Sequence, residues 1–167
     1  MPTNWISIYQ LNGYCLKDLA SFPAKDRQLW AEEVAKVEKK TFPSSEAFDF
    51  DSELRKKNTS VILVLTNQDT SELAGYLVYV RTKRLALLHK ICVVEHERGK
   101  GVGRYLVHSL RDRLEKGGCQ SILLWVDEAR QPARMLYRSC DFVQIDRCLD
   151  YYGPGRTGLK MELSIEK

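Results

Sequence analysis

The chain has 167 residues, of which 44% are apolar and 29% are charged. This length and composition are typical of one globular, water-soluble domain with a proper core, and they exclude fibrous and disordered proteins. The net charge of +4, from 26 basic and 22 acidic residues, is too mild for the concentrated basic face of a nucleic-acid-binding protein. We therefore expect a single domain over residues 1–167 and no nucleic-acid partner.

The sequence gives no sign of a membrane anchor or of a cysteine framework. No apolar stretch reaches the roughly 20 residues that span a bilayer, and the first ten residues lack a basic start followed by a long apolar segment. We therefore expect no membrane partner and a cytoplasmic location, with the nucleus as an alternative. Five scattered cysteines without a CxxC pair predict buried thiols, with neither a disulfide framework nor a metal site.

The first half of the chain predicts a strand, a helix and three further strands. Residues 5–9 alternate apolar and polar side chains as a half-buried strand does, and residues 26–40 have helical spacing. Phe42 and Pro43 end this helix, and an acidic loop or short helix follows over residues 44–53. An antiparallel meander is expected from three apolar runs, at residues 61–66, 73–81 and 85–94.

The second half alternates helices and strands and closes with a hairpin. The apolar residues of 102–116 fall on one helical face, and Gly117 and Gly118 supply a left-handed stop. Pro132 marks the start of another helix. The strands expected here are a doubly buried one at 121–126 and two that are joined by turn-forming residues, at 142–151 and 158–165.

Three glycines within five residues lie between the strand at 85–94 and the helix at 102–116, in the run EHERGKGVGRYLV. The first N–H groups of a helix lack internal partners and lie at the positive end of its dipole, so an anion binds there. The run therefore predicts a pyrophosphate site, with an ordinary glycine-rich turn as the alternative. It matches neither GxxxxGK[ST] nor a GxGxxG after the first strand of a βαβ unit, which excludes two nucleotide-binding classes. The residues expected to bind are Arg98, Gly99, Lys100, Gly101, Val102, Gly103 and Arg104.

The spacing Arg98-x-x-Gly101-x-Gly103 resembles the Q/R-x-x-G-x-G/A signature of the GNAT superfamily of acetyltransferases. The resemblance covers about residues 60–165, in family order. It implies acetyl-CoA as the cofactor, with the turn around the pyrophosphate of coenzyme A. It also implies an α+β fold, with a mixed, mostly antiparallel sheet of about seven strands and about four flanking helices. In that family the sheet splays open between its fourth and fifth strands, here 85–94 and 121–126.

The resemblance also implies positions for further site residues. The ending DYYGPGRTGLKMEL resembles protein N-terminal acetyltransferases of the ribosomal-protein type. Arg130 replaces a family asparagine that contacts the cofactor, and Asp141 replaces a family glycine before Phe142. The strand residues expected along the pantetheine arm are Ile91, Cys92 and Val93. The residues expected to contact the acceptor are Phe42, Glu46, Tyr151 and Tyr152.

Two residues are candidates for proton transfer. Tyr137, in the run MLYRSCDF, matches the family tyrosine that protonates the leaving sulfur, although packing on an apolar helix face is its alternative. The strand position at which relatives carry a glutamate or histidine base is Trp125, which cannot accept a proton. We expect His89 as the substitute, because it lies two residues from Leu87, where some relatives carry a tyrosine. The alternatives are a purely structural His89, or Glu46 or Asp127 acting through water.

Ionisation costs favour an α-amine as the acceptor. An α-amine of pKa ~7.8 costs about 1 kcal/mol to deprotonate at pH 7, whereas a lysine of pKa ~10.4 costs about 4.6 kcal/mol. Against this, a lysine-rich tail or a polyamine suits the acidic cluster Glu46, Asp49, Asp51 and Glu53. We predict an acetyl-CoA-dependent N-acetyltransferase in which a protein amine, N-terminal or lysine, attacks the thioester directly. The alternatives are a small-amine or polyamine acetyltransferase and a catalytically weak acyl-CoA-binding module, and the expected assembly is a monomer or weak homodimer.

Overall fold

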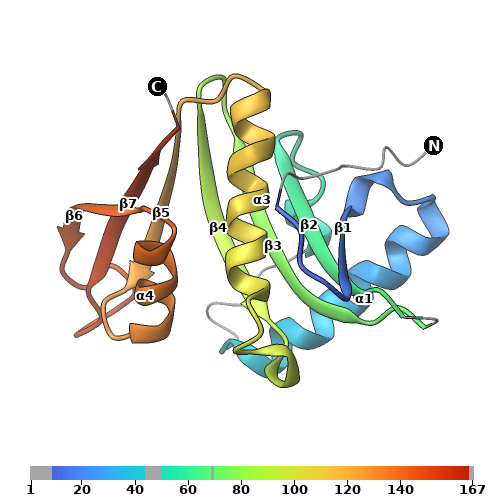
Figure 1. Cartoon of the computed structure of the whole chain (residues 1–167). Coiled ribbons are helices and arrows are strands. Elements are labelled where there is room, and N and C mark those ends of the chain that lie inside the picture. Colours follow the sequence, from blue (N-terminus) through green and yellow to red (C-terminus); the bar gives the residue numbers. More distant parts are fainter. Residues whose placement is uncertain (1–8, 44–49, 69, 166–167) are drawn as a thin grey trace.

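The computed structural model describes residues 9–43, 50–68 and 70–165. Within these residues, seven strands form one sheet in the order β1-β2-β3-β4-β5-β7-β6 (Figure 1). All neighbouring strands are antiparallel except β4 and β5, which are parallel. The strands are β1 (Tyr14–Asp18), β2 (Thr59–Thr66), β3 (Leu73–Arg81), β4 (Leu85–Val93), β5 (Ser121–Asp127), β6 (Val143–Cys148) and β7 (Gly158–Ser164). The predicted mixed, mostly antiparallel sheet is confirmed.

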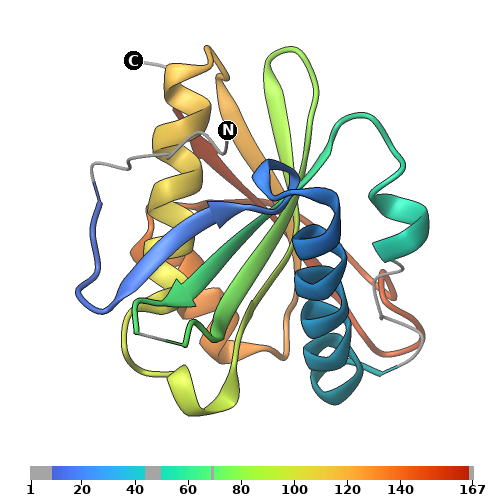
Figure 2. The ribbon, with the colours of Figure 1, turned by 90° about the vertical axis from the view of Figure 1, so that its right-hand side faces the viewer.

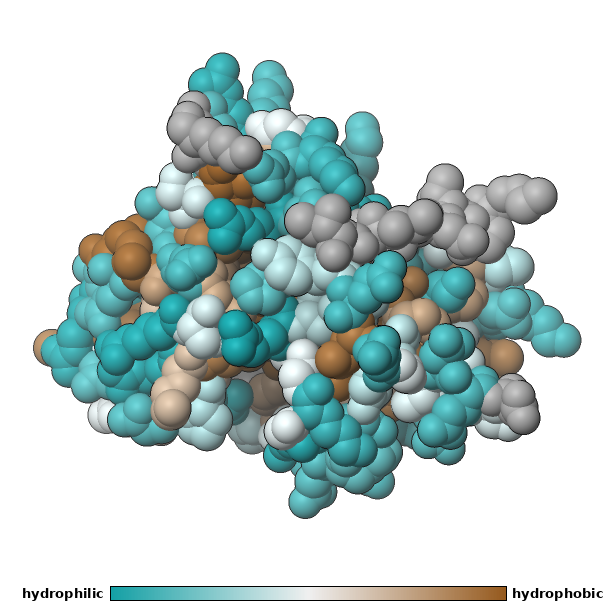
Figure 3. Space-filling model, in the orientation of Figure 1, coloured by the Kyte–Doolittle hydropathy of each residue, from teal (hydrophilic) through white to brown (hydrophobic). Residues whose placement is uncertain are grey.

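Helices cover both faces of this sheet. The α-helices are α1 (Ala24–Thr41), α2 (Phe50–Glu53), α3 (Val102–Lys116) and α4 (Gln131–Ser139). Helix α1 lies on one face and α3 on the other (Figure 2), while α4 lies on the α3 side, beside β5 (Figure 1). Among the described residues, no helix has the length and apolar character needed to cross a membrane. The face of the molecule seen in Figure 3 is mainly hydrophilic, with apolar side chains in small separate groups.

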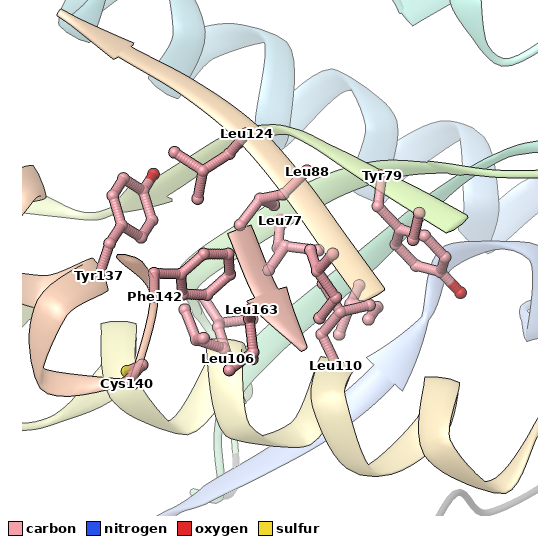
Figure 4. Packing of buried hydrophobic residues seen from close by; sticks show 14 of the residues in the cluster. Leu77, Tyr79, Leu88, Leu106, Leu110, Leu124, Tyr137, Cys140, Phe142 and Leu163 are labelled. Atoms are coloured by element: carbon pink, nitrogen blue, oxygen red, sulfur yellow. The ribbon is translucent and has the colours of Figure 1, made fainter. Parts of the chain in front are cut away.

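The larger core lies between α3 and the sheet. Leu106 and Leu110 are fully buried there and pack in one cluster with Leu77 and Leu88 of the sheet (Figure 4). Apolar side chains three and four residues apart lie on one face of a helix, which is why the spacing in α3 produces this layer. Each fully buried leucine contributes about 1.5–3 kcal/mol to folding. The second core lies under α1, around Val34.

The sheet opens between β4 and β5, as the family resemblance implied. These two strands pair only over residues 85–87 and 121–123, and beyond that point they diverge (Figure 1). A register change opposite Val78 and Tyr79 also interrupts β4. Because of this bulge, Leu88 packs in the core under α3, whereas Lys90, two residues further on, contacts Glu38 of α1 on the other face. The opening and the bulge together create space beside the end of β4.

Some elements differ from the sequence expectations. The predicted strand at residues 5–9 lies outside the described residues except for Tyr9, which is not in a strand. The first described strand, β1, was not predicted, because five residues with a single buried side chain, Leu16, make too weak a pattern. Of the segment 44–53, only α2 is described. Asp141 adopts a left-handed conformation with φ 71°, which explains why glycine suits this position in the family.

Candidate active site

The glycine turn before α3 leaves its backbone open. Gly99 and Gly101 have φ values of 79° and 89°, in the left-handed region that side chains disfavour, and Gly101 is the N-cap of α3. No atom lies within 4 Å of the position that a Cβ of Gly99 would occupy. Gly103 has a different role, since a Cβ there would lie 3.1 Å from Cδ2 of Leu136. Two glycines therefore expose the main chain, and the third lets α4 approach α3.

A groove of about 510 Å³ runs along this turn, and we call it the glycine groove. It lies where β4 ends and α3 and α4 begin, and it collects most of the residues that the sequence assigned to the cofactor. Its lining is Thr41, Phe42, Ile91, Cys92, Val93, Arg98, Gly99, Gly101, Val102, Gly103, Arg104, Arg130, Pro132, Ala133 and Leu136. Open main-chain amides and three arginines fit a pyrophosphate group. The groove thus has the chemistry that coenzyme A requires.

Lys100 is the one predicted cofactor residue outside this lining. Its Nζ lies 3.4 Å from Oε2 of Glu97, a buried carboxylate that the sequence analysis did not single out. The hydroxyl of Tyr14 in β1 donates to the same oxygen, and this hydrogen bond is the main cause that holds the pKa of Glu97 below its usual value. Arg98 connects the turn to the end of β4, since its Nε donates a hydrogen bond to the Val93 carbonyl oxygen at 3.1 Å. These contacts fix the turn to β1 and β4.

A second cavity, of about 340 Å³, adjoins the groove, and we call it the aromatic cavity. It shares Phe42, Ile91, Arg130 and Ala133 with the glycine groove, so the two spaces lie side by side. The rest of its lining is His89, Lys90, Trp125, Val126, Asp127, Tyr137, Tyr152 and Arg156. Both residues predicted for proton transfer, together with Phe42 and Tyr152, therefore meet in one space.

Tyr137 projects from α4 at the edge of the larger core. It packs against Phe142 at 5.7 Å between ring centroids, and Figure 4 shows it beside Phe142 and Leu124. Burial raises the pKa of the Tyr137 hydroxyl above its ordinary value, while the positive charge of Arg130 opposes that rise. The phenol therefore stays protonated throughout the neutral pH range and is available as a proton donor.

His89 lies in the bulged part of β4, at the wall of the aromatic cavity. Loss of solvent lowers the pKa of its imidazole below the ordinary value, and Lys56 adds to this effect while Glu53 opposes it. A histidine with a lowered pKa is neutral at pH 7, which is the form that accepts a proton. The geometry therefore brings a proton acceptor and a proton donor to the same cavity.

Aromatic rings form much of the cavity wall. Trp125 stacks on Tyr151 at 4.2 Å between centroids, and Tyr151 meets Tyr152 edge-on at 4.8 Å. Tyr151 itself is exposed and outside the lining, so its contact with the cavity is through Trp125. Phe42, which directly follows α1, contributes a further ring, and Lys90 Nζ lies over this ring, 4.0 Å from its centroid.

Two ion pairs involve residues of the cavity lining. Glu38 of α1 lies 3.0 Å from Lys90 Nζ and also accepts a hydrogen bond from the hydroxyl of Tyr76. Oδ2 of Asp127 accepts from Arg156 at 2.9 and 3.2 Å, and its Oδ1 accepts from a backbone N–H, the main cause of the lowered pKa of Asp127. Among the described residues of the lining, Asp127 is the one carboxylate, and its oxygens are occupied.

The acidic cluster from the sequence analysis is only partly described. Glu46 and Asp49 lie outside the described residues, as does the side chain of Asp51. Glu53 pairs with Lys56 at 2.8 Å on the surface. The expectation that Glu46 contacts the acceptor therefore stays a prediction.

Comparison with known proteins identifies the family. Residues 27–142 match the model of the Acetyltransferase (GNAT) family, which is more than half of the chain, so the chain belongs to this family. Its activity is N-acetyl transfer, and acetyl-CoA is the cosubstrate. No curated protein sequence matches the chain significantly.

Solved structures with this fold act on different acceptors. The ribosomal-protein-S18-alanine N-acetyltransferase of Escherichia coli has a TM-score of 0.75 at 20% identity, with 92% of this chain and 95% of that chain covered. Arabidopsis thaliana NAA60 with acetyl-CoA has 0.74 at 16% identity, with 91% and 98% covered. An aminoglycoside 6'-N-acetyltransferase with coenzyme A has 0.73 at 14% identity, with 91% and 97% covered. At these identities the likeness establishes the fold and leaves the acceptor undetermined.

Proposed function

We propose that this enzyme acetylates the N-terminal α-amine of a protein or peptide. The observation that carries the proposal is the chemistry of the aromatic cavity. Trp125 occupies the position at which relatives have a base, and we assign the role of proton acceptor to His89, which lines the same cavity and has a lowered pKa. A weak base suits an α-amine, since deprotonating it at pH 7 costs about 1 kcal/mol, against about 4.6 kcal/mol for a lysine.

The charges of the cavity argue against a polyamine acceptor. A polyamine carries at least two ammonium groups, and burying each requires an anionic partner. Asp127 is engaged by Arg156 and by the backbone, and the described lining also contains Lys90 and Arg130. An acceptor with a single amine and an uncharged remainder suits this environment better. The small-amine alternative has its support in the fold shared with the aminoglycoside acetyltransferase.

The proposal assigns roles to the residues of both spaces. The open amides of the glycine turn, with Arg98 and Arg104, hold the pyrophosphate of coenzyme A, and Ile91, Cys92 and Val93 line its pantetheine arm. When bound, acetyl-CoA supplies an activated acetyl group, which the acceptor amine attacks directly. His89 removes the proton of the amine, and Tyr137 supplies a proton from its hydroxyl to the departing sulfur. Arg130 assists Tyr137, because its charge stabilises the deprotonated phenol.

An acceptor screen tests this proposal. Release of the coenzyme A thiol is measured with acetyl-CoA and one of four acceptors: a peptide with a free N-terminus and no lysine, the same peptide with a blocked N-terminus and one internal lysine, spermidine, or an aminoglycoside. We expect the highest kcat/KM with the free N-terminus. A preference for spermidine or for the lysine peptide would contradict the proposal, as would the absence of thiol release with every acceptor.

A further inference from the structure

Trp125 lies in the aromatic cavity, at the position where relatives carry a catalytic base. It is a residue of β5, its ring lines the cavity, and it has no group that accepts a proton. A large, flat apolar surface in a catalytic cavity excludes water and favours apolar groups. A role in binding the acceptor therefore fits the Trp125 side chain better than a role in proton transfer.

The Trp125 ring is held in place by its contacts with neighbouring rings. Tyr151 stacks on it with only 15° between the ring planes, and Tyr152 supports Tyr151 edge-on. Tyr151 can lie there because Gly158 of β7 has no side chain, since a Cβ on Gly158 would come within 2.8 Å of the Tyr151 ring. A ring fixed before the ligand arrives loses little conformational entropy on binding.

Three aromatic rings from separate elements surround the same space. Phe42 follows α1, Trp125 belongs to β5, and Tyr152 lies between β6 and β7. Cations lie over all three rings, with Lys90 and Arg130 over Phe42 at 4.0 and 5.2 Å, Arg156 over Tyr152 at 5.4 Å and, at the longest distance, Lys160 over Trp125 at 6.0 Å. The space suits a long apolar side chain, and a thioether makes additional favourable contacts with aromatic rings.

We propose that Trp125 is a specificity-determining residue that selects acceptors whose first side chain is long and apolar, such as methionine or leucine, over glycine or serine. Tyr151 is a positioning residue that acts through Trp125. This inference rests on the proposed function, because it requires that the reacting amine be an N-terminal α-amine.

Peptides that differ only in their first residue test the inference. We expect kcat/KM of the wild type to be about tenfold higher for Met and Leu peptides than for Ser and Gly peptides, a typical discrimination by an apolar pocket. In Trp125→Ala, KM for the Met peptide rises until this ratio approaches one, while KM for the Ser peptide changes little. Trp125→Phe retains part of the ratio, and Tyr151→Ala reduces it less than Trp125→Ala does.

Leu149→Ala is the matched control. Leu149 lies in the connection between β6 and β7, is exposed and lines neither space, so its loss leaves the ratio unchanged. Thermal stabilisation by coenzyme A shows for each variant that the fold and the glycine groove persist. Equal kcat/KM for all first residues in the wild type, or an unaltered ratio in a folded Trp125→Ala, would overturn the inference and leave the proposed function intact. Absence of turnover with every peptide would overturn both.

Discussion

The glycine groove and the aromatic cavity are built from the chain in different ways. Most of the groove comes from one stretch, residues 91–104, and its binding groups are main-chain amides exposed by glycines. The aromatic cavity takes its lining from the end of α1, from β4, β5 and α4, and from the connection between β6 and β7. In the function that we propose, the cofactor shared by the whole family is bound by local backbone geometry, whereas the acceptor is bound by side chains that only the tertiary fold brings together.

The largest effect is expected from a side chain in the glycine turn. Gly101→Val places a β-branched residue at φ 89° and fills the space above the turn. We expect coenzyme A to bind at least about 100-fold more weakly, as measured by calorimetry. The matched control is Gly118→Val, at φ 79° beyond the far end of α3, which imposes similar strain away from the groove. Equal affinity losses in the two variants would mean that strain, rather than the open backbone, controls binding.

The second largest effect is expected on kcat, from a substitution in the aromatic cavity. Tyr137→Phe removes the proton donor and almost no volume, so we expect kcat to fall at least about tenfold while the affinity for coenzyme A is unchanged. Steady-state kinetics and calorimetry on the same preparation separate the two quantities. The control is Tyr105→Phe, which alters a buried tyrosine of α3 outside both linings. Unaltered kcat in Tyr137→Phe would remove this residue from its role.

The pH dependence of kcat tests the proton acceptor. Because desolvation lowers the pKa of His89, the imidazole stays neutral to a lower pH than an ordinary histidine, and kcat falls only as His89 becomes protonated. We expect an acidic limb with its midpoint below the ordinary value of about 6.5. His89→Ala removes this limb and leaves the titration of the α-amine itself, near pKa ~7.8, and it lowers kcat about fivefold at pH 7, where deprotonating the α-amine costs about 1 kcal/mol. The matched control is His96→Ala, which changes an exposed histidine outside both linings. An acidic limb whose midpoint is the same in His89→Ala as in the wild type would identify another base.

The smallest effect distinguishes among the cations of the turn. Lys100 lies against Glu97 and outside the glycine groove, whereas Arg104 lines it. We expect Lys100→Ala to weaken coenzyme A binding less than about threefold and Arg104→Ala to weaken it about tenfold, because charge-assisted hydrogen bonds to a phosphate are the stronger contacts. Both values come from calorimetry at one ionic strength. The reverse order would mean that Lys100 leaves Glu97 when the cofactor binds.

Much of the fold was predictable because the signals were local. The apolar spacing of residues 102–116 and the glycines on either side of that segment gave both bounds of α3, Val102–Lys116. Continuous apolar runs likewise marked β2, β3, β4 and β5. The short strand β1 carried too little pattern, since Leu16 is its one buried residue.

The unpredicted parts of the site depend on contacts between distant residues. Glu97 is buried because β1 brings Tyr14 to it, and Glu38 is buried because α1 brings it to Lys90. No local pattern marks such pairs, since a single charged residue usually lies on the surface. The bulge at His89 has no sequence signature either, and the Trp125 stack depends on a glycine 33 positions away in the sequence, Gly158.

The central claim is that open main-chain amides at the start of α3 bind a diphosphate. Calorimetry that compares coenzyme A with pantetheine, which lacks the diphosphate and the 3′-phosphoadenosine attached to it, tests this claim most directly. We expect coenzyme A to bind the folded protein saturably and at least about 100-fold more tightly than pantetheine. Equal affinity for the two compounds, or no heat with coenzyme A, would contradict the claim.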